Sequence, residues 1–299
     1  MRKPPPTPPR ARHSAMRRMA RALLRGASIS APSVPRRVPR SRARAGSARN
    51  SASASSSAAS PAPPTPADVL GATERWIDES VVGLNLCPFA RAPRASDGIR
   101  IVVSEARDYD PFFDEFRREA QRLALTYTDA DHAYDEDDED DDDAAAAAAA
   151  DPAPEDARSS PTPSPEPRWA APGLSEPSTT LIVAPYVADI DDFLLFLAVV
   201  ERCEAIVDEL DLSGYVQLAT FHPEYQFAGE EVADPGSYTN RSPYPTVHLL
   251  RVVDVSRAVD AHPDPESIPE ANVDRLRGLG RKTLHDRLKA LVAWRAPRG

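Results

Sequence analysis

The sequence has few of the residues on which disulfide-bonded and membrane-spanning proteins depend. Its 299 residues include two cysteines, Cys87 and Cys203, which are too few for a disulfide framework. No apolar run approaches the roughly 20 residues that a helix needs to cross a bilayer. These two absences predict a protein without a structural disulfide and without a membrane partner.

Several short motifs of nucleotide binding and catalysis are also missing. The chain contains no G-x-x-x-x-G-K-[ST], no G-x-G-x-x-G, no G-x-S-x-G and no C-x-x-C. Nucleoside triphosphate, dinucleotide, serine-hydrolase and dithiol functions therefore lack their usual sequence support. The sequence leaves the cofactor unknown.

Acidic residues are absent from the first 60 positions, where the charged side chains are Arg and Lys. This segment contains a short basic amphipathic stretch, Met16–Gly26, and then a tail rich in Ser and Ala. That composition is typical of an organelle transit peptide, and it lacks the apolar centre of a secretory signal. We predict that residues 1–64 are a disordered transit peptide and linker, which directs the protein to the chloroplast or, alternatively, to the mitochondrion.

The same basic segment has a second interpretation, a disordered arm that binds nucleic acid. It contains no aromatic residue on which a base could stack. The whole chain also has a formal net charge of -10, whereas phosphate neutralisation requires clustered Lys and Arg. We therefore predict no nucleic-acid partner.

A low-complexity region interrupts the rest of the chain. Nine consecutive acids, Asp135–Asp143, precede seven alanines and a segment rich in Pro, Ser and Glu. Such a composition has too few apolar side chains to offset the entropy lost on ordering. We predict that residues 127–177 are a disordered insertion in one folded domain, which comprises residues 65–126 and 178–293 and is followed by a tail at 294–299.

Outside these regions, strand patterns alternate with helical patterns. Strands are predicted at Ile101–Val103, Ser178–Pro185 and Tyr215–Phe221, with amphipathic helices between them. That order is typical of βαβ units with parallel pairing. The predicted fold class is a single α/β domain with a βαβαβ parallel core, a fourth strand at Thr246–Val253 and C-terminal helices, although the fourth segment also fits a helix.

The polar, aromatic segment between the third and fourth predicted strands is the predicted functional region. Parallel α/β sheets bind ligands beyond the carboxyl ends of their strands. His222 follows the third strand and His248 lies in the fourth, so both are expected near one rim of the sheet. If these strands are antiparallel neighbours, the two rings are expected to approach each other. Glu105 and Tyr186 are expected at the same rim.

Five motifs in this order resemble the bacterial family called domain of unknown function 1415. The motifs lie at Gly83–Ala90, Thr220–Pro223, Tyr225–Gly229, Tyr238–Pro245 and His248–Arg251. The resemblance covers about residues 67–281 without the acidic insertion, and it implies no activity because the family is uncharacterised. The basic leader and the acidic run depart from the compact bacterial pattern and suggest an organelle-targeted eukaryotic member.

One candidate chemistry is catalysis by Cys87, His222 and His248. A histidine would activate the Cys87 thiol as a nucleophile. The alternative for Cys87 is a buried thiol in a hydrophobic corner. The two histidines could also bind a metal ion with Glu224 or Glu105, but their separation along the chain is not a diagnostic ligand spacing, so no metal site is predicted.

A second candidate chemistry is the binding of a small anion, either a phosphate or a carboxylate. Arginine makes charge-assisted bonds to such groups, and the amides of a tight turn form an anion-binding concavity. The predicted ligand-binding residues are Tyr225, Asn240, Arg241, Ser242 and Arg251. The alternative is a structural role, in which the arginine is salt-bridged and the serine caps a turn.

A third possibility is a non-catalytic interaction or assembly protein. Tyr225, Phe227, Tyr238 and Tyr244 would then form a protein-binding surface, because exposed tyrosines are favoured at interfaces. One concave pocket that collects the imidazole and charged groups would favour the small-molecule interpretation. A flat aromatic face would favour the protein partner.

Overall fold

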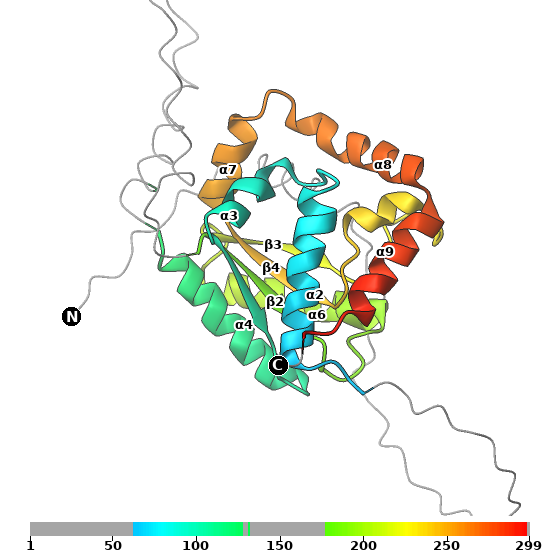
Figure 1. The fold of residues 1–299 in the computed structure, drawn as a ribbon. Coiled ribbons are helices and arrows are strands. Elements are labelled where there is room, and N and C mark those ends of the chain that lie inside the picture. Colours follow the sequence, from blue (N-terminus) through cyan, green and yellow to red (C-terminus); the bar gives the residue numbers. More distant parts are fainter. Residues whose placement is uncertain (1–61, 128–130, 132–176, 298–299) are drawn as a thin grey trace, which may run out of the picture.

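The computed structural model describes residues 62–127, 131 and 177–297. The transit peptide and most of the insertion that the sequence predicts therefore lie outside the described residues. The described chain forms one α/β domain, in which helices cover both faces of a four-stranded sheet (Figure 1). This confirms the predicted α/β class.

The sheet has the strand order β1-β2-β4-β3. Its strands are β1 (Ile99–Val103), β2 (Thr179–Val183), β3 (Val216–Phe221) and β4 (Thr246–Arg251). β1 and β2 pair in parallel, whereas β4 pairs antiparallel with both β2 and β3. β3 therefore runs in the same direction as β1 and β2, with β4 lying between β2 and β3.

The position of β4 differs in one respect from the predicted parallel core. The sequence pattern predicts parallel pairing among the first three strands, but in the described sheet only β1 and β2 pair in this way. The β3–β4 connection contains the short 3₁₀ helix η4 (Pro235–Thr239) and no crossover helix. Parallel neighbours need such a crossover, so this connection produces an antiparallel pair.

One face of the sheet is covered by α4 (Tyr109–Ala124) and α6 (Phe193–Glu209). Both helices bury an apolar stripe against the strand residues that point to this face, among them Ile182, Val247 and Leu249. Each of these three side chains is at most 1% exposed, and all three belong to the largest core cluster among the described residues. In Figure 1, α6 lies behind the sheet.

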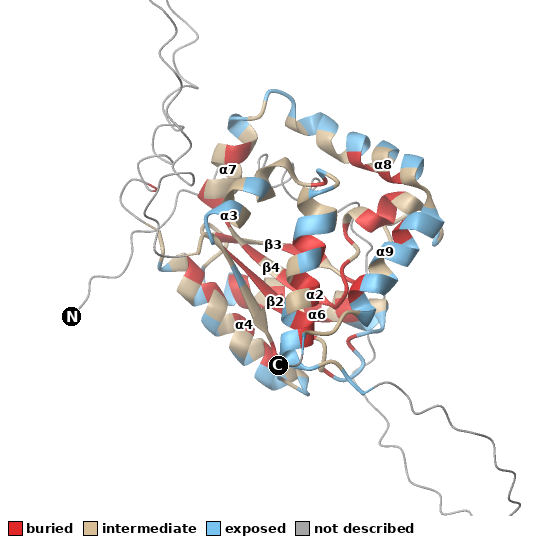
Figure 2. Ribbon diagram, in the orientation of Figure 1, coloured by how far each residue is buried: buried red, intermediate tan, exposed pale blue. Residues whose placement is uncertain are grey.

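The opposite face is covered by α2 (Pro66–Trp76), which continues into a π-helical turn, Ile77–Val82. α2 begins at a capping box, because the Thr65 hydroxyl accepts from the Asp68 amide while the Asp68 carboxylate accepts from the Thr65 amide. α2 lies in front of the sheet in Figure 1, and Figure 2 shows its sheet-facing side as buried. The second face is therefore also a packed layer.

The remaining helices extend this second layer beyond the sheet. They are the short η2 (Pro88–Ala90), α3 (Arg91–Ala95), α7 (Val252–Asp260), η5 (Pro265–Ser267), α8 (Ile268–Leu279) and α9 (Arg281–Ala293). α8 and α9 meet at Gly280, whose φ of 78° favours glycine. In the described part of the chain, no helix is both long and apolar enough to span a membrane.

Candidate functional site

The alternation of side chains along the strands divides the predicted site residues between the two faces of the sheet. His248 shares a face with Leu181 and Phe221, which point toward α2 and the π-helical turn. His222, which follows β3, packs against Phe193 and Phe196 of α6 on the other face. The two histidines are therefore not brought together, although β3 and β4 are antiparallel neighbours.

A cavity of about 380 Å³ lies on the face that carries His248. Its walls come from the α2–π-helix segment, the sheet, the β3–β4 loop and α8. Most of its surface is apolar, and the apolar residues that line it include Trp76, Ile77, Val81, Leu86, Ile99, Leu181, Phe221, Phe227, Leu250, Ile268 and Val273. Among the catalytic and anion-binding residues proposed from the sequence, Cys87, Asn240 and His248 line this cavity, and Phe227 of the proposed protein-binding surface lines it as well.

The π-helical turn determines how the chain enters the cavity wall. π-Helical turns are rare and occur frequently at functional sites. The turn ends at Gly83, where an added Cβ would lie 2.6 Å from the carbonyl oxygen of Glu79, so a side chain does not fit. Asn85 then adopts a positive φ of 50°. This reversal brings Leu86 and Cys87 to the cavity.

Cys87 is partly buried and lines the cavity just before η2. Its φ and ψ are extended, as expected for a residue that precedes a proline. Burial raises the pKa of the Cys87 thiol, and hydrogen bonds from the backbone amides of Phe89 and Ala90 oppose that shift without cancelling it. At neutral pH, Cys87 is therefore a protonated thiol and not a thiolate.

His248 reaches from β4 to the neighbouring strand β2, where its Nε2 hydrogen-bonds to the Thr179 hydroxyl. That hydroxyl also donates to the carbonyl oxygen of Leu249, at 2.7 Å. Burial lowers the pKa of His248 to about 4, so its imidazole is neutral at physiological pH. The cavity thus contains a neutral thiol and a neutral imidazole.

Charged groups gather where the β3–β4 loop meets α8. Arg277 is 2.8 Å from Asp234 and 3.5 Å from Glu230, and all three residues line the cavity. The arginine lowers the pKa of Asp234 chiefly through their side-chain hydrogen bond. Two carboxylates therefore surround one guanidinium at this end of the cavity.

His222 makes two hydrogen bonds on the other face of the sheet. Its Nδ1 accepts from the Glu224 amide at 3.0 Å, so its Nε2 carries the proton and donates to the Ile190 carbonyl oxygen at 3.1 Å. Burial lowers the pKa of the ring, which keeps it neutral. With both nitrogens bonded to backbone groups, His222 stabilises the start of the β3–β4 loop.

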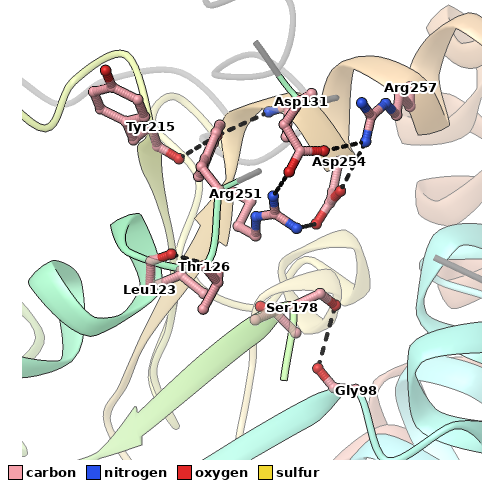
Figure 3. A network of polar contacts seen from close by, with 12 residues as sticks. Gly98, Leu123, Thr126, Asp131, Ser178, Tyr215, Arg251, Asp254 and Arg257 are labelled. Atoms are coloured by element: carbon pink, nitrogen blue, oxygen red, sulfur yellow. Dashed lines mark hydrogen bonds and ion pairs between the residues drawn. The ribbon is translucent and has the colours of Figure 1, made fainter. Parts of the chain in front are cut away.

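Arg251 lies in a buried ion network on the α4 side of the molecule (Figure 3). Its guanidinium is 2.6 Å from Asp131 and 3.3 Å from Asp254, and Arg257 lies 2.8 Å from Asp131. The Arg251 guanidinium also lies 4.5 Å from the centre of the Tyr127 ring. Arg251 is thus paired with protein carboxylates and does not line the cavity.

Asp131 belongs to the segment that the sequence assigns to the disordered insertion, residues 127–177. The Asp131 side chain is 4% exposed and contacts two arginines of the folded domain. The insertion therefore contributes at least one buried ionic contact, which its composition did not reveal.

The side chains of the predicted anion-binding loop donate hydrogen bonds mainly to backbone carbonyl oxygens. Arg241 donates from Nε to the Tyr225 carbonyl oxygen at 3.0 Å, and it lies over the Tyr238 ring at 4.4 Å. The Asn240 side-chain amide donates to the Thr220 carbonyl oxygen, and the Ser242 hydroxyl donates to the Tyr244 carbonyl oxygen. Of these loop residues, only Asn240 is also among the described residues that line the cavity.

Sequence reasoning missed residues in and next to the cavity that come from distant segments. Asn272 and Arg277 line the cavity and belong to α8, while Thr179, which bonds to His248 without lining the cavity, begins β2. The Asn272 amide donates to the Leu86 carbonyl oxygen at 2.6 Å, which fastens α8 to the segment that carries Cys87. The strand register could have identified Thr179 as a neighbour of His248, but nothing in the sequence of α8 indicates where that helix docks.

Within the described residues, no cluster of three or more His, Cys, Asp or Glu side chains could hold a metal ion.

Comparison with known proteins gives one match. The model of a family described as protein of unknown function (DUF1415) matches residues 68–133 and 171–286. No curated protein and no solved structure matches the chain.

Proposed function

Because the chain belongs to the DUF1415 family of proteins of unknown function, we propose its role from the geometry of the cavity: it binds a small organic molecule with a mainly apolar body. The observation that carries this proposal is the cavity of about 380 Å³, which four separate segments enclose with apolar side chains and a few polar groups. Small-molecule sites typically have this size and this composition.

The packing around the cavity supports a binding role. Protein interiors are close-packed, and an empty space of this size forfeits many favourable contacts. His248 and Asn240 are polar residues in its otherwise mainly apolar lining. A retained cavity with oriented polar groups is consistent with a ligand that fills it.

The sequence predicts a small anion as the ligand, and the cavity gives that prediction limited support. Arg277 is the single arginine among the described residues that line the cavity, and it already faces Asp234 and Glu230. Arg241 and Arg251, which the anion hypothesis names, lie outside the lining. A ligand without a net negative charge fits these surroundings better, because the one guanidinium in the described lining is already paired with carboxylates.

Catalysis remains a second candidate function for the same cavity. Cys87 and His248 both line it, so the same cavity contains a thiol and an imidazole. Both groups are neutral at rest, since burial raises the pKa of Cys87 and lowers that of His248. Thiol chemistry would therefore require transfer of the Cys87 proton to a base, and the neutral imidazole of His248 is the candidate base in the lining.

The interaction-protein alternative depends on an exposed tyrosine surface. Tyr225, Tyr238 and Tyr244 are 6%, 7% and 8% exposed. Their rings pack against the helices around the loop: Tyr225 contacts Phe193 of α6, Tyr238 lies in a cluster with Leu276 of α8, and Tyr244 lies in a cluster with Val69 of α2. Buried rings offer a partner little contact area, so the geometry favours the small-molecule proposal.

A fragment screen with a cavity-blocked variant tests the proposal. Ala228→Trp would place an indole in the cavity, which Ala228 lines, whereas Ala271→Trp would add the same ring on the exposed side of α8. Ligand-observed NMR should detect apolar fragments that bind the wild type and Ala271→Trp but not Ala228→Trp. Equal binding to all three proteins, or no binding to the wild type, would overturn the proposal.

A further inference from the structure

The hydrogen bonds around His248 determine which of its ring nitrogens carries the proton. The Thr179 hydroxyl has one proton, which it donates to the Leu249 carbonyl oxygen at 2.7 Å, and that carbonyl can only accept. The hydroxyl is therefore left as an acceptor toward the Nε2 atom of His248. Because the ring is neutral, a proton on Nε2 leaves Nδ1 without one.

The Nδ1 atom is the group that His248 offers to the cavity. It makes no hydrogen bond to any described residue. It is also absent from the fully enclosed polar atoms, so part of its surface is accessible. Since His248 lines the cavity, its accessible ring edge faces that space. An unpaired acceptor in an apolar enclosure favours a ligand that donates a hydrogen bond, because desolvating it without a partner costs free energy.

We infer that the ligand carries a hydrogen-bond donor, a hydroxyl or an N–H, which binds Nδ1 of His248, and that Thr179 is the positioning residue that keeps this nitrogen an acceptor. This inference rests on the proposed function, the binding of a small, mainly apolar molecule in the same cavity. An alcohol, a phenol or an indole has the required chemistry. A carboxylate or phosphate without a proton does not, because it would face the Nδ1 lone pair with its own.

Several other polar groups of the cavity already bond to protein groups. Glu230 and Asp234 are oriented toward Arg277. The Asn272 side chain is fastened to the Leu86 carbonyl oxygen. Cys87 is the remaining titratable group named in the lining, and its raised pKa leaves it a weak donor. His248 is thus the lining group best placed to select for a donor.

The first test measures the tautomer in the protein without added ligand. Nitrogen-15 NMR of the histidine rings separates protonated from unprotonated ring nitrogens, and His248→Gln identifies the signals, because His222 shares the same tautomer. We expect His248 to carry its proton on Nε2 in the wild type and in Thr179→Ser. In Thr179→Val, which removes the hydroxyl at similar volume, both tautomers should be populated. A proton on Nδ1 in the wild type would overturn the inference.

The second test compares probes that differ in one donor. 2-Naphthol is paired with 2-methoxynaphthalene, and indole with N-methylindole, and their dissociation constants are measured by NMR titration. One hydrogen bond to a buried acceptor should make the donor member bind about tenfold more tightly to the wild type and to Thr179→Ser. The ratio of the two dissociation constants should be smaller in Thr179→Val, because either ring nitrogen of His248 can then carry the proton.

The outcomes separate the inference from the proposed function. If both members of each pair bind the wild type equally, the donor requirement is wrong while cavity binding stands. If the preference is unchanged in Thr179→Val, the positioning role of Thr179 is wrong. If no probe binds the wild type, the proposed function fails and the inference fails with it.

Discussion

At the scale of single residues, hydrogen bonds and burial distinguish groups that look alike in the sequence. His222 and His248 are both partly or fully buried and neutral, yet His222 has both nitrogens bonded to backbone groups, whereas His248 keeps Nδ1 available to the cavity. Arg241 and Arg251 differ similarly, because both lie over a tyrosine ring but the first donates to a backbone carbonyl oxygen whereas the second is paired with two carboxylates. Residue type alone does not assign these roles.

The lowered pKa of His248 should make stability depend on pH. The unfolded histidine titrates near its ordinary pKa of about 6.5, and the folded one titrates at about 4. The unfolded state therefore binds more protons between these values, so the stabilising contribution is complete above pH 6.5 and is lost as pH falls toward 4. His248→Gln should reduce the slope by up to about 1.4 kcal/mol per pH unit.

Urea denaturation at a series of pH values between 4 and 7 measures this slope. The control is His285→Gln, on the exposed side of α9, which should leave the curve unchanged. A His248→Gln protein whose slope equals that of the wild type would show that His248 is not held neutral in the folded state.

Asp131 should be important for stability although it lies in the predicted linker. Asp131→Asn removes the carboxylate that pairs with both Arg251 and Arg257 in the buried network, which also contains Asp254. Breaking a buried ion pair from one side typically costs about 3 kcal/mol, because an uncompensated charge remains. Asp114→Asn is the matched control, since Asp114 is 67% exposed and pairs with Arg117 on the surface.

Chemical denaturation of the two variants compares these contributions. Asp114→Asn should change the unfolding free energy by less than about 0.5 kcal/mol, as exposed ion pairs contribute little. If Asp131→Asn also changes the unfolding free energy by less than about 0.5 kcal/mol, the buried contacts of Asp131 do not stabilise the domain.

At the scale of elements, α8 closes the cavity and is held at both ends. Asn272 fastens its first half to the Leu86 carbonyl oxygen, and Arg275 donates to the Asn85 carbonyl oxygen at 3.1 Å. Arg277 bridges its second half to Asp234. The helix is otherwise exposed on its outer side, as Figure 2 shows.

Removing the Asn272 contact should loosen α8 locally. Asn272→Ala deletes the buried donor and leaves the Leu86 carbonyl oxygen unpaired, which should cost about 1 to 2 kcal/mol. Hydrogen exchange followed by mass spectrometry should show faster exchange in peptides from α8, with little change in β2 or β4. Asp274→Ala, on the exposed side of the same helix, should exchange like the wild type. Unchanged exchange in Asn272→Ala would show that another contact holds α8.

At the scale of the whole molecule, the sequence predicts which elements exist better than where they meet. The α/β class and the four strands follow from local apolar patterns, and the structure confirms them. The place of β4 and the docking of α8 depend on contacts between distant segments, which local patterns do not encode. The cavity was therefore not predictable as a unit, although Cys87, Asn240 and His248 were each identified.

The basic leader gives a prediction that concerns the whole chain in the cell. Its composition favours import into an organelle, with the chloroplast ahead of the mitochondrion. A fluorescent reporter fused after residues 1–67 should accumulate in one of these organelles. A reporter that stays in the cytosol or enters the nucleus would contradict this prediction.

The central claim, a small-molecule site between α8 and the sheet, is tested most directly by locating a bound fragment. Methyl-labelled protein is titrated with a fragment found in the screen, and the shifted methyl signals are assigned. We expect shifts at Ile77, Leu181, Leu250 and Val273, which line the cavity, and none at the exposed Leu194 of α6. Shifts confined to Leu194 and its surroundings, with the cavity methyl groups unmoved, would contradict the account.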